Sequence, residues 1–178
     1  MTTFAAVQPE NATGRAADLL AQVQTTLGVT PNMTKVMANS PALLQGYLAL
    51  SGAVGRGTLP AAVRERLAIA TAQLNGCEYC LSAHTYFGAT AAKLSAGELE
   101  SARRGRSRDA HVDALLTLSN AIAENAGDVD ESDVDAARAA GVTEEEIGEV
   151  VANLALNILT NYFNVLTRVD NDWPVVTL

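Results

Sequence analysis

The sequence is poor in the residues that mark several classes of protein. It holds two cysteines in 178 residues, too few to cross-link a secreted domain, so in a reducing compartment the pair indicates redox or metal chemistry. Aromatic residues make up only 4% and charged residues 18%, whereas hydrophobic residues reach 48%. A chain of this length and composition can bury the core of one domain.

Basic charge and long apolar runs are also scarce. The net charge of -8 argues against nucleic acids and anionic membranes as partners, since both select clustered Lys and Arg. No uninterrupted apolar run reaches the ~18 residues of a membrane span, and residues 1–10 lack the pattern of a secretion signal. We therefore expect a cytoplasmic protein with no nucleic-acid or membrane partner.

Helix signals recur along the chain and strand signals do not. Ser95 with Glu98 and Thr143 with Glu146 form capping boxes, which are typical of helix starts. Apolar spacing and stop residues predict helices over 13–27, 40–54, 60–74, a segment holding the cysteines, a short segment after residue 95, 109–125, 132–140 and 144–166. We expect one all-α domain over residues 1–178, with 1–12 and 171–178 as extended arms. The helix over 144–166 is apolar on nearly every side, which predicts burial in the domain centre or between subunits.

Most of the reactive side chains lie in one short segment. Cys77, Cys80 and His84 include both cysteines and one of the two histidines. On a helix they fall at about 0°, 300° and 340° around the axis, so they share one face. Cys80 and His84 have the i, i+4 spacing of neighbouring side chains.

The dipeptide Asn75-Gly76 predicts a tight turn between two helices. If the chain folds back at that turn, Glu65 lies roughly 15 Å from the turn along the first helix and His84 roughly 12 Å from it along the second, antiparallel helix. The two residues therefore come to similar heights. A carboxylate beside an imidazole orients the ring, and such a histidine can take a proton from the thiol of Cys80 one turn away. Cys77 falls near the first turn of its helix, where the helix dipole stabilises a thiolate.

The same residues admit other interpretations. The cysteines could be small buried hydrophobes, and two thiolates with His84 are three of the four ligands that zinc prefers, which leaves Glu65 as the fourth. Taken alone, Glu65 would be an ordinary surface charge. The redox interpretation explains more of the pattern, because a thiolate oxidised to sulfenic acid by a peroxide can condense with a second cysteine three residues away to a disulfide.

This pattern resembles the alkylhydroperoxidase D family of the carboxymuconolactone decarboxylase superfamily. Glu65, Cys77-Glu78-Tyr79-Cys80 and His84 match its Glu, Cys-x-x-Cys, x-x-x-His pattern. The similarity extends to the segments 30–33, 40–43, 59–65, 161–164 and 172–174. It implies an all-helical fold with the Cys-x-x-Cys at the start of a helix that follows a helical hairpin turn.

The resemblance also implies a function, a thiol-dependent peroxidase that reduces organic hydroperoxides and needs no cofactor. Cys80 would be the attacking and Cys77 the resolving cysteine, with Glu65 and His84 as the proton relay and no metal. The implied partners are a dithiol reductant, such as a lipoyl group or a thioredoxin-like protein, and further copies of the chain in a trimer or hexamer.

One residue departs from the family pattern. The best-characterised members have a histidine immediately before the second cysteine, where this chain has Tyr79. A phenol is a poor base at neutral pH, so we expect a reduced relay. A non-catalytic redox sensor that uses the same pair remains an alternative, and lactone decarboxylation is a weaker one because it would not need the cysteines.

Overall fold

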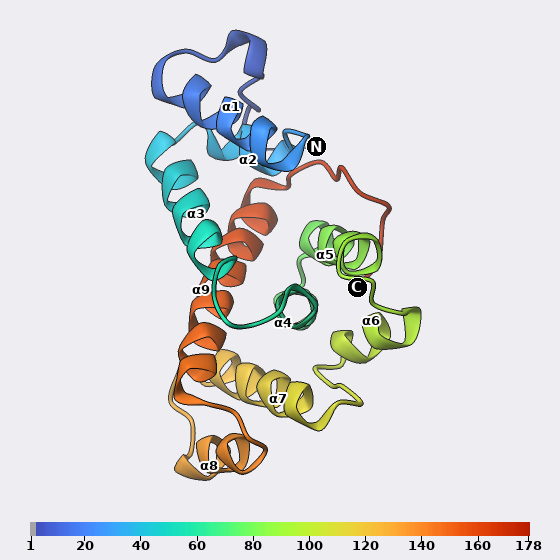
Figure 1. The fold of residues 1–178 in the computed structure, drawn as a ribbon. Coiled ribbons are helices and arrows are strands. Elements are labelled where there is room, and N and C mark those ends of the chain that lie inside the picture. Colours follow the sequence, from blue (N-terminus) through green and yellow to red (C-terminus); the bar gives the residue numbers. More distant parts are fainter. Residues whose placement is uncertain (1–2) are drawn as a thin grey trace.

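The computed structural model describes residues 3–178, and this part of the chain is helical without any strand (Figure 1). The prediction of an all-α fold is therefore confirmed. The elements of the described range are a short 3-10 helix η1 (Pro9–Asn11) and the α-helices α1 (Gly14–Leu27), α2 (Asn32–Met37), α3 (Pro41–Val54), α4 (Ala61–Leu74), α5 (Glu78–Thr90), α6 (Ala96–Arg103), α7 (Ala110–Glu124), α8 (Glu131–Ala139) and α9 (Glu144–Thr167). Of these, α2 and η1 have no counterpart among the helices expected from the sequence.

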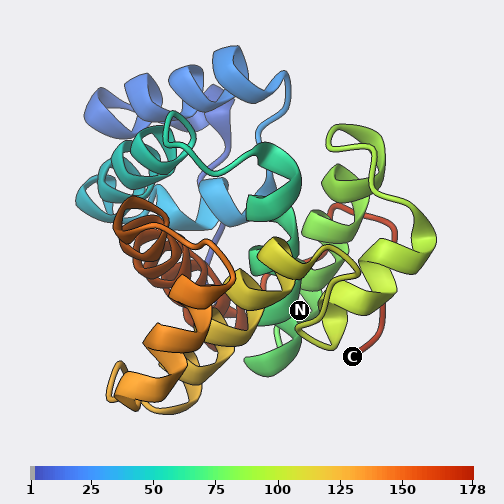
Figure 2. The ribbon, with the colours of Figure 1, turned by 60° about the horizontal axis from the view of Figure 1, so that its bottom comes forward.

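Helix α4 lies at the centre of the molecule. It packs against α5, α6, α7 and α9, and Figures 1 and 2 show these helices around it from two directions. One face of α4 sends Ile69 and Ala72 into an apolar core shared with α1, α2, α3 and α5. Another face sends Val63 and Leu67 into a second core shared with α7, α8 and α9. The position of α4 thus fixes the helix that follows it.

The turn between α4 and α5 has the predicted form. Helix α4 ends at Asn75, and Gly76 adopts a left-handed conformation with φ of 64°, which a residue without a Cβ takes up at little cost. Cys77 is then the N-cap of α5. The Cys-x-x-Cys pair therefore stands at the start of a helix, directly after a helical hairpin turn.

In helix α9 the side that faces the protein interior is mostly polar and the outer side carries large apolar residues, the reverse of an ordinary core helix. Its buried positions are mostly polar: Asn153, Asn157, Thr160, Asn161, Asn164 and Thr167, with only Val150 and Leu154 apolar. Large apolar side chains lie outside, among them Tyr162 at 61% and Leu166 at 71% exposure. Burial in the domain centre is thus limited to one side of α9, which is lined mostly by Asn and Thr, and burial of the outer side between subunits stays a prediction.

By length and composition α9 could also cross a membrane, the one helix of residues 3–178 of which this holds. Core helices of soluble proteins pass the same test, and 44% of the most apolar window is buried inside the structure. In this fold α9 packs against α3, α4, α5 and α7, so a role within the helical domain accounts for its composition.

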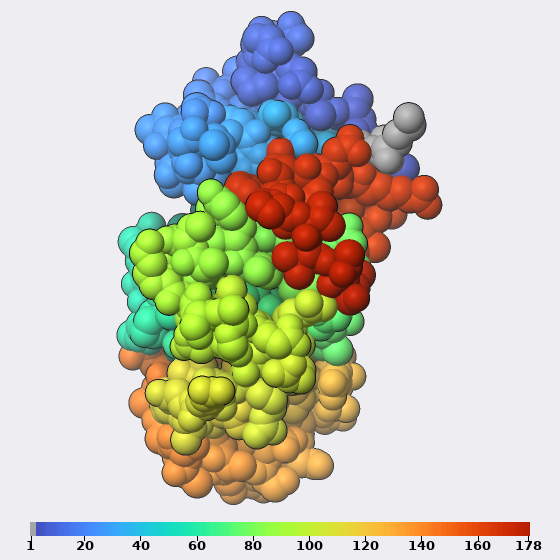
Figure 3. Space-filling view, turned by 90° about the vertical axis from the view of Figure 1, so that its right-hand side faces the viewer, coloured from blue at the N-terminus to red at the C-terminus, as the bar shows by residue number. Residues whose placement is uncertain are grey.

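Both ends of the chain lie along helices. In the N-terminal arm, Thr3 donates its backbone N–H to Thr167, and Val7 donates to Lys35; residues 1 and 2 of that arm lie outside the described residues. The C-terminal tail beyond α9 crosses the molecule between the N-terminal helices and the α5–α6 region, as the red segment of Figure 3 shows. Its Val176 N–H donates to the Ser82 hydroxyl of α5 at 3.0 Å, so the tail is attached to the helix that carries the cysteines.

Candidate functional site

The cysteine pair sits at the buried N-terminus of α5. Cys77 and Cys80 form a disulfide, and their exposed fractions are 1% and 3%. Because Cys77 is the N-cap, its sulfur accepts a hydrogen bond from the backbone N–H of Cys80 at 3.2 Å. Unpaired N–H groups at a helix start favour negative charge on such a sulfur.

Glu65 and His84 meet across the hairpin. Glu65 Oε2 lies 2.8 Å from His84 Nδ1, and the two side chains are 22% and 28% exposed. The carboxylate occupies Nδ1, so the ring is oriented with its other nitrogen free for a different partner. The structure therefore pairs Glu65 of α4 with His84 of α5, and Cys77 and Cys80 stand at the start of that same helix α5.

A cavity of about 320 Å³ opens beside these groups. Its wall includes Cys80, Glu65 and His84, while Cys77 is not part of it. The remaining wall is mainly apolar and aromatic, with Leu27, Pro31, Met33, Tyr47, Ser51, Tyr79, Ala83, Phe87, Leu156, Asn157, Thr160, Asn164 and Trp173. A compact organic molecule in this cavity would lie against Cys80 and not against Cys77.

Tyr79 serves a different purpose from a general base. It is 8% exposed, and its hydroxyl donates to Asp172 Oδ2 at 2.7 Å. Burial, followed by the hydrogen bond and the negative charge of Asp172, raises the pKa of Tyr79 well above its ordinary value of 10. The phenol therefore keeps its proton at neutral pH and ties α5 to the C-terminal tail.

The tail closes one side of the cavity. Trp173 stacks on Tyr86 and meets Phe87 edge-on, with ring centroids 5.5 Å and 4.8 Å apart. Asp172 also accepts the backbone N–H of Asn32 at the start of α2. The short tail thus joins α5, α2 and the cavity wall.

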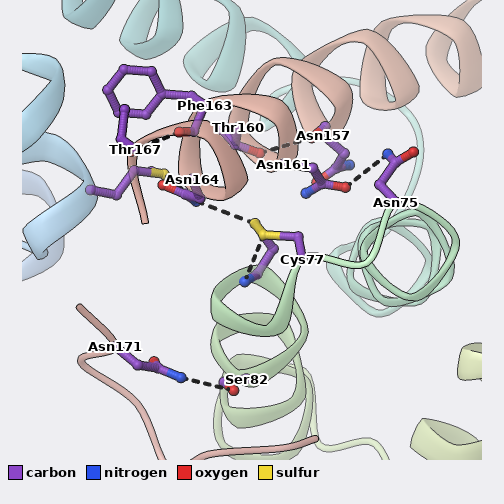
Figure 4. The surroundings of a disulfide bond; sticks show 12 residues. Asn75, Cys77, Ser82, Asn157, Thr160, Asn161, Phe163, Asn164, Thr167 and Asn171 are labelled. Atoms are coloured by element: carbon purple, nitrogen blue, oxygen red, sulfur yellow. Dashed lines mark hydrogen bonds between the residues drawn. A yellow bond between two sulfur atoms is a disulfide. The ribbon is translucent and has the colours of Figure 1, made fainter. Parts of the chain in front are cut away.

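Asn164 is a site residue that sequence reasoning did not single out. Its side-chain Nδ2 donates to Cys80 Sγ at 3.2 Å and to Met33 Sδ at 3.3 Å, and Figure 4 shows it on α9 facing the sulfur pair. The residue entered the sequence argument only within the segment 161–164. The available signal was the periodic placing of Asn and Thr along an otherwise apolar helix.

No metal cluster is evident in the described part of the chain. Within residues 3–178, no group of three or more His, Cys, Asp or Glu side chains is gathered closely enough to hold an ion. Both sulfurs are engaged in the disulfide.

The segment of the chain that carries this site is similar to a known protein family. Residues 41–125, which include Glu65, both cysteines and His84, match the carboxymuconolactone decarboxylase family. No curated protein shows significant sequence similarity to the chain.

The fold is shared with several solved structures. One is the alkylhydroperoxidase AhpD core of an uncharacterized peroxidase-related protein from Ralstonia eutropha JMP134, with a TM-score of 0.85 and 20% identity over 96% of this chain and 92% of that one. An uncharacterized peroxidase-related protein from Silicibacter sp. TM1040 has a TM-score of 0.80 and 20% identity, over 95% of this chain and 91% of that one. The debrominase Bmp8, solved as a cysteine-to-alanine variant in complex with 2,3,4-tribromopyrrole, has a TM-score of 0.80 and 18% identity, over 97% of this chain and 92% of that one.

The family match covers the segment that carries the site, and the structural matches extend the common fold over nearly the whole chain. Residues 41–125 are thus similar to the carboxymuconolactone decarboxylase family, and the chain as a whole has the fold of the AhpD-like structures.

Proposed function

We propose that the protein is a thiol-dependent peroxidase that reduces organic hydroperoxides through a Cys77–Cys80 dithiol–disulfide cycle. The observation that carries the proposal is the position of the Cys80 sulfur on the wall of an apolar cavity, beside the paired Glu65 and His84. A second sulfur behind it already forms the disulfide that such a cycle requires.

The chemistry starts from the reduced pair. His84 takes the proton of the Cys80 thiol, while Glu65 orients the ring and balances its positive charge. The thiolate attacks the outer oxygen of the hydroperoxide, the O–O bond breaks, and Cys80 becomes a sulfenic acid. The alkoxide that leaves takes the proton from the His84 imidazolium and departs as an alcohol.

The second half of the cycle forms the disulfide seen in the structure. The Cys77 sulfur attacks the sulfenic sulfur of Cys80, the S–O bond breaks, and the hydroxide takes the Cys77 proton to leave as water. An external dithiol, such as a lipoyl group or a thioredoxin-like protein, then returns two electrons by thiol–disulfide exchange. The sum is one hydroperoxide and one dithiol converted to one alcohol, one water and one disulfide.

The test measures loss of cumene hydroperoxide with dithiothreitol as the reductant. We expect steady turnover by the wild type and no loss above the protein-free rate for Cys80→Ser. Glu65→Gln should lower the rate about 100-fold, because the relay loses the group that holds its histidine. Glu145→Gln, which alters an exposed carboxylate on the first turn of α9, is the matched control and should keep the wild-type rate.

Two results would count against peroxidase turnover. Full activity of Cys80→Ser would show that the thiol pair is not the reacting group. A single stoichiometric oxidation of the pair, with no further peroxide loss, would instead support a redox sensor that uses the same cysteines as a switch.

A second candidate reaction is reductive dehalogenation of a small aromatic compound. It is favoured by the shared fold of the debrominase Bmp8, whose complex holds 2,3,4-tribromopyrrole, and by the aromatic lining of the cavity here. The same dithiol could supply the two electrons, since an aryl bromide and two thiols balance to the arene, a disulfide and hydrogen bromide. Bromide release from tribromopyrrole, measured beside hydroperoxide loss, decides between the two substrates.

A further inference from the structure

Asn164 behaves differently from most polar residues on the inward face of α9. Asn153, Asn157 and Thr167 each donate a hydrogen bond to the backbone carbonyl four residues earlier in the helix, at 2.6–2.8 Å. This is the local solution open to polar side chains inside a helix. Asn161 instead accepts a hydrogen bond from the side chain of Asn75. The side chain of Asn164 does not bond a backbone carbonyl of residues 3–178. Its amide NH2 group donates to two sulfur atoms from other helices, Cys80 Sγ on α5 and Met33 Sδ on α2.

These two sulfurs determine which way the amide faces. A thioether sulfur has no hydrogen to give, so the group that faces Met33 must be the NH2 group rather than the oxygen. The carbonyl oxygen Oδ1 then points elsewhere. It is fully buried and has no hydrogen-bond partner among residues 3–178. Buried polar atoms without a partner are rare, so the amide is held by its contacts to the two sulfurs and not by its oxygen.

We propose that Asn164 is a positioning residue which holds Cys80 as the attacking thiolate through Nδ2. The inference rests on the proposed function only for the statement that Cys80 is the attacking sulfur; the contact itself concerns the thiol alone.

A hydrogen bond from an amide stabilises a thiolate more than a disulfide sulfur, because the thiolate carries the full negative charge. The contact seen to Cys80 in the disulfide should therefore strengthen when the pair is reduced. Cys77 draws its donor from the backbone at the helix start, away from the cavity. Asn164 thus supports the one sulfur that a substrate can reach.

The charged and titratable groups around Cys80 come from few elements. The groups on the cavity wall are Tyr47 from α3, Glu65 from α4, and Tyr79 and His84 from α5; Cys77 lies behind the wall, and Asp172 of the tail is bonded to Tyr79. Helices α9 and α2 contribute the neutral side chains of Asn164 and Met33 to the same wall, and of these two Asn164 bonds the sulfur. The amide is therefore a donor to Cys80 that does not change its charge between pH 5 and 9.

The cavity of about 320 Å³ with apolar walls favours a compact alkyl or aryl hydroperoxide over a lipid-sized one.

The first experiment measures the pH dependence of iodoacetamide alkylation at Cys80 in a Cys77→Ser background. Adding Asn164→Leu, which keeps the volume, should raise the midpoint by about 1 to 2 pH units through loss of the donor. Asn164→Asp, which replaces the donor by a negative charge, should raise it further. Asn161→Leu alters a buried asparagine of the same helix that bonds Asn75, and it should leave the midpoint unchanged.

The second experiment measures tert-butyl hydroperoxide turnover of the wild type and of Asn164→Leu over the same pH range. The rate of the variant should reach its maximum at a pH higher by about the same 1 to 2 units, because the thiolate forms later.

The outcomes separate this proposal from the proposed function. An unmoved midpoint in folded Asn164→Leu, judged by circular dichroism, would overturn the role at sulfur. A shifted midpoint in a protein whose wild type turns over no hydroperoxide would contradict the peroxidase assignment and leave the thiolate contact standing.

Discussion

At the scale of single residues, Tyr79 shows how a substitution inside a motif can change its purpose. A histidine at this position could exchange protons at neutral pH. The buried phenol of Tyr79 instead keeps its proton and donates a hydrogen bond to Asp172. The sequence comparison predicted a weaker relay at this point. The structure adds a structural role, because the same hydroxyl fastens the tail that forms part of the cavity wall.

Tyr79→Phe should therefore act on stability and on the tail. We expect the free energy of unfolding to fall by about 1–3 kcal/mol, the range for a hydrogen bond to a charged group. Hydrogen exchange at the backbone amide of Val176 should become faster, as read by mass spectrometry or NMR. The alkylation midpoint of Cys80 should stay where it is. A large change in that midpoint, with protection of the tail intact, would instead assign Tyr79 to the proton relay.

At the scale of elements, the hairpin of α4 and α5 brings the site together. Its predictability came from local signals: a strong turn dipeptide, helical spacing between Cys80 and His84, and equal lengths of helix on either side. Glu65 and His84 are 19 residues apart and meet as expected.

Contacts at longer range were not predictable from the same signals. Asn164 lies 84 residues from Cys80, and Asp172 lies 93 residues from Tyr79. Their partners depend on how α9 and the tail pack, which no local pattern encodes. Helix α2 was missed for a different reason, since it has six residues and its N-cap, Pro31, makes no side-chain cap.

Gly76→Ala tests the turn that makes this hairpin. A Cβ at a φ of 64° strains the backbone, and we expect a loss of about 1–2 kcal/mol in the free energy of unfolding. Gly97→Ala is the matched control, because an added Cβ there meets nothing within 4 Å and lies in the first turn of α6. Urea denaturation should show a lower midpoint for the first variant and an equal or higher one for the second. Equal midpoints for both would mean that the turn relaxes freely.

At the scale of the whole molecule, the outer face of α9 is the most distinctive surface. The side chains at 151, 155, 158, 162 and 165 follow a 4-3-4-3 spacing, the seam by which one helix packs along another. Val151, Tyr162 and Val165 on this seam are 48%, 61% and 50% exposed. A second copy of the chain, presenting the same spacing, is the partner that we propose for it, in line with the expected trimer or hexamer.

Val165→Glu should disrupt that association. A charge in the middle of an apolar seam is unfavourable without a partner, so the mass in solution should fall to that of one chain. Light scattering after size-exclusion chromatography gives the measurement. Val175→Glu, which places the same charge on an exposed valine of the tail, should leave the mass unchanged. A wild type that already runs as a single chain would contradict the proposed partner.

The end of the tail has a practical consequence for any such experiment. A Cβ built on Gly76 would stand 4.0 Å from the side chain of Leu178, so the last residue lies beside the turn that opens the cysteine helix. Arg103 also bonds the carbonyl of Thr177 at 2.9 Å and holds this end in place. A purification tag or fluorescent label fused after Leu178 would therefore begin at the turn itself, and preparations meant for thiol measurements should leave the C-terminus unextended.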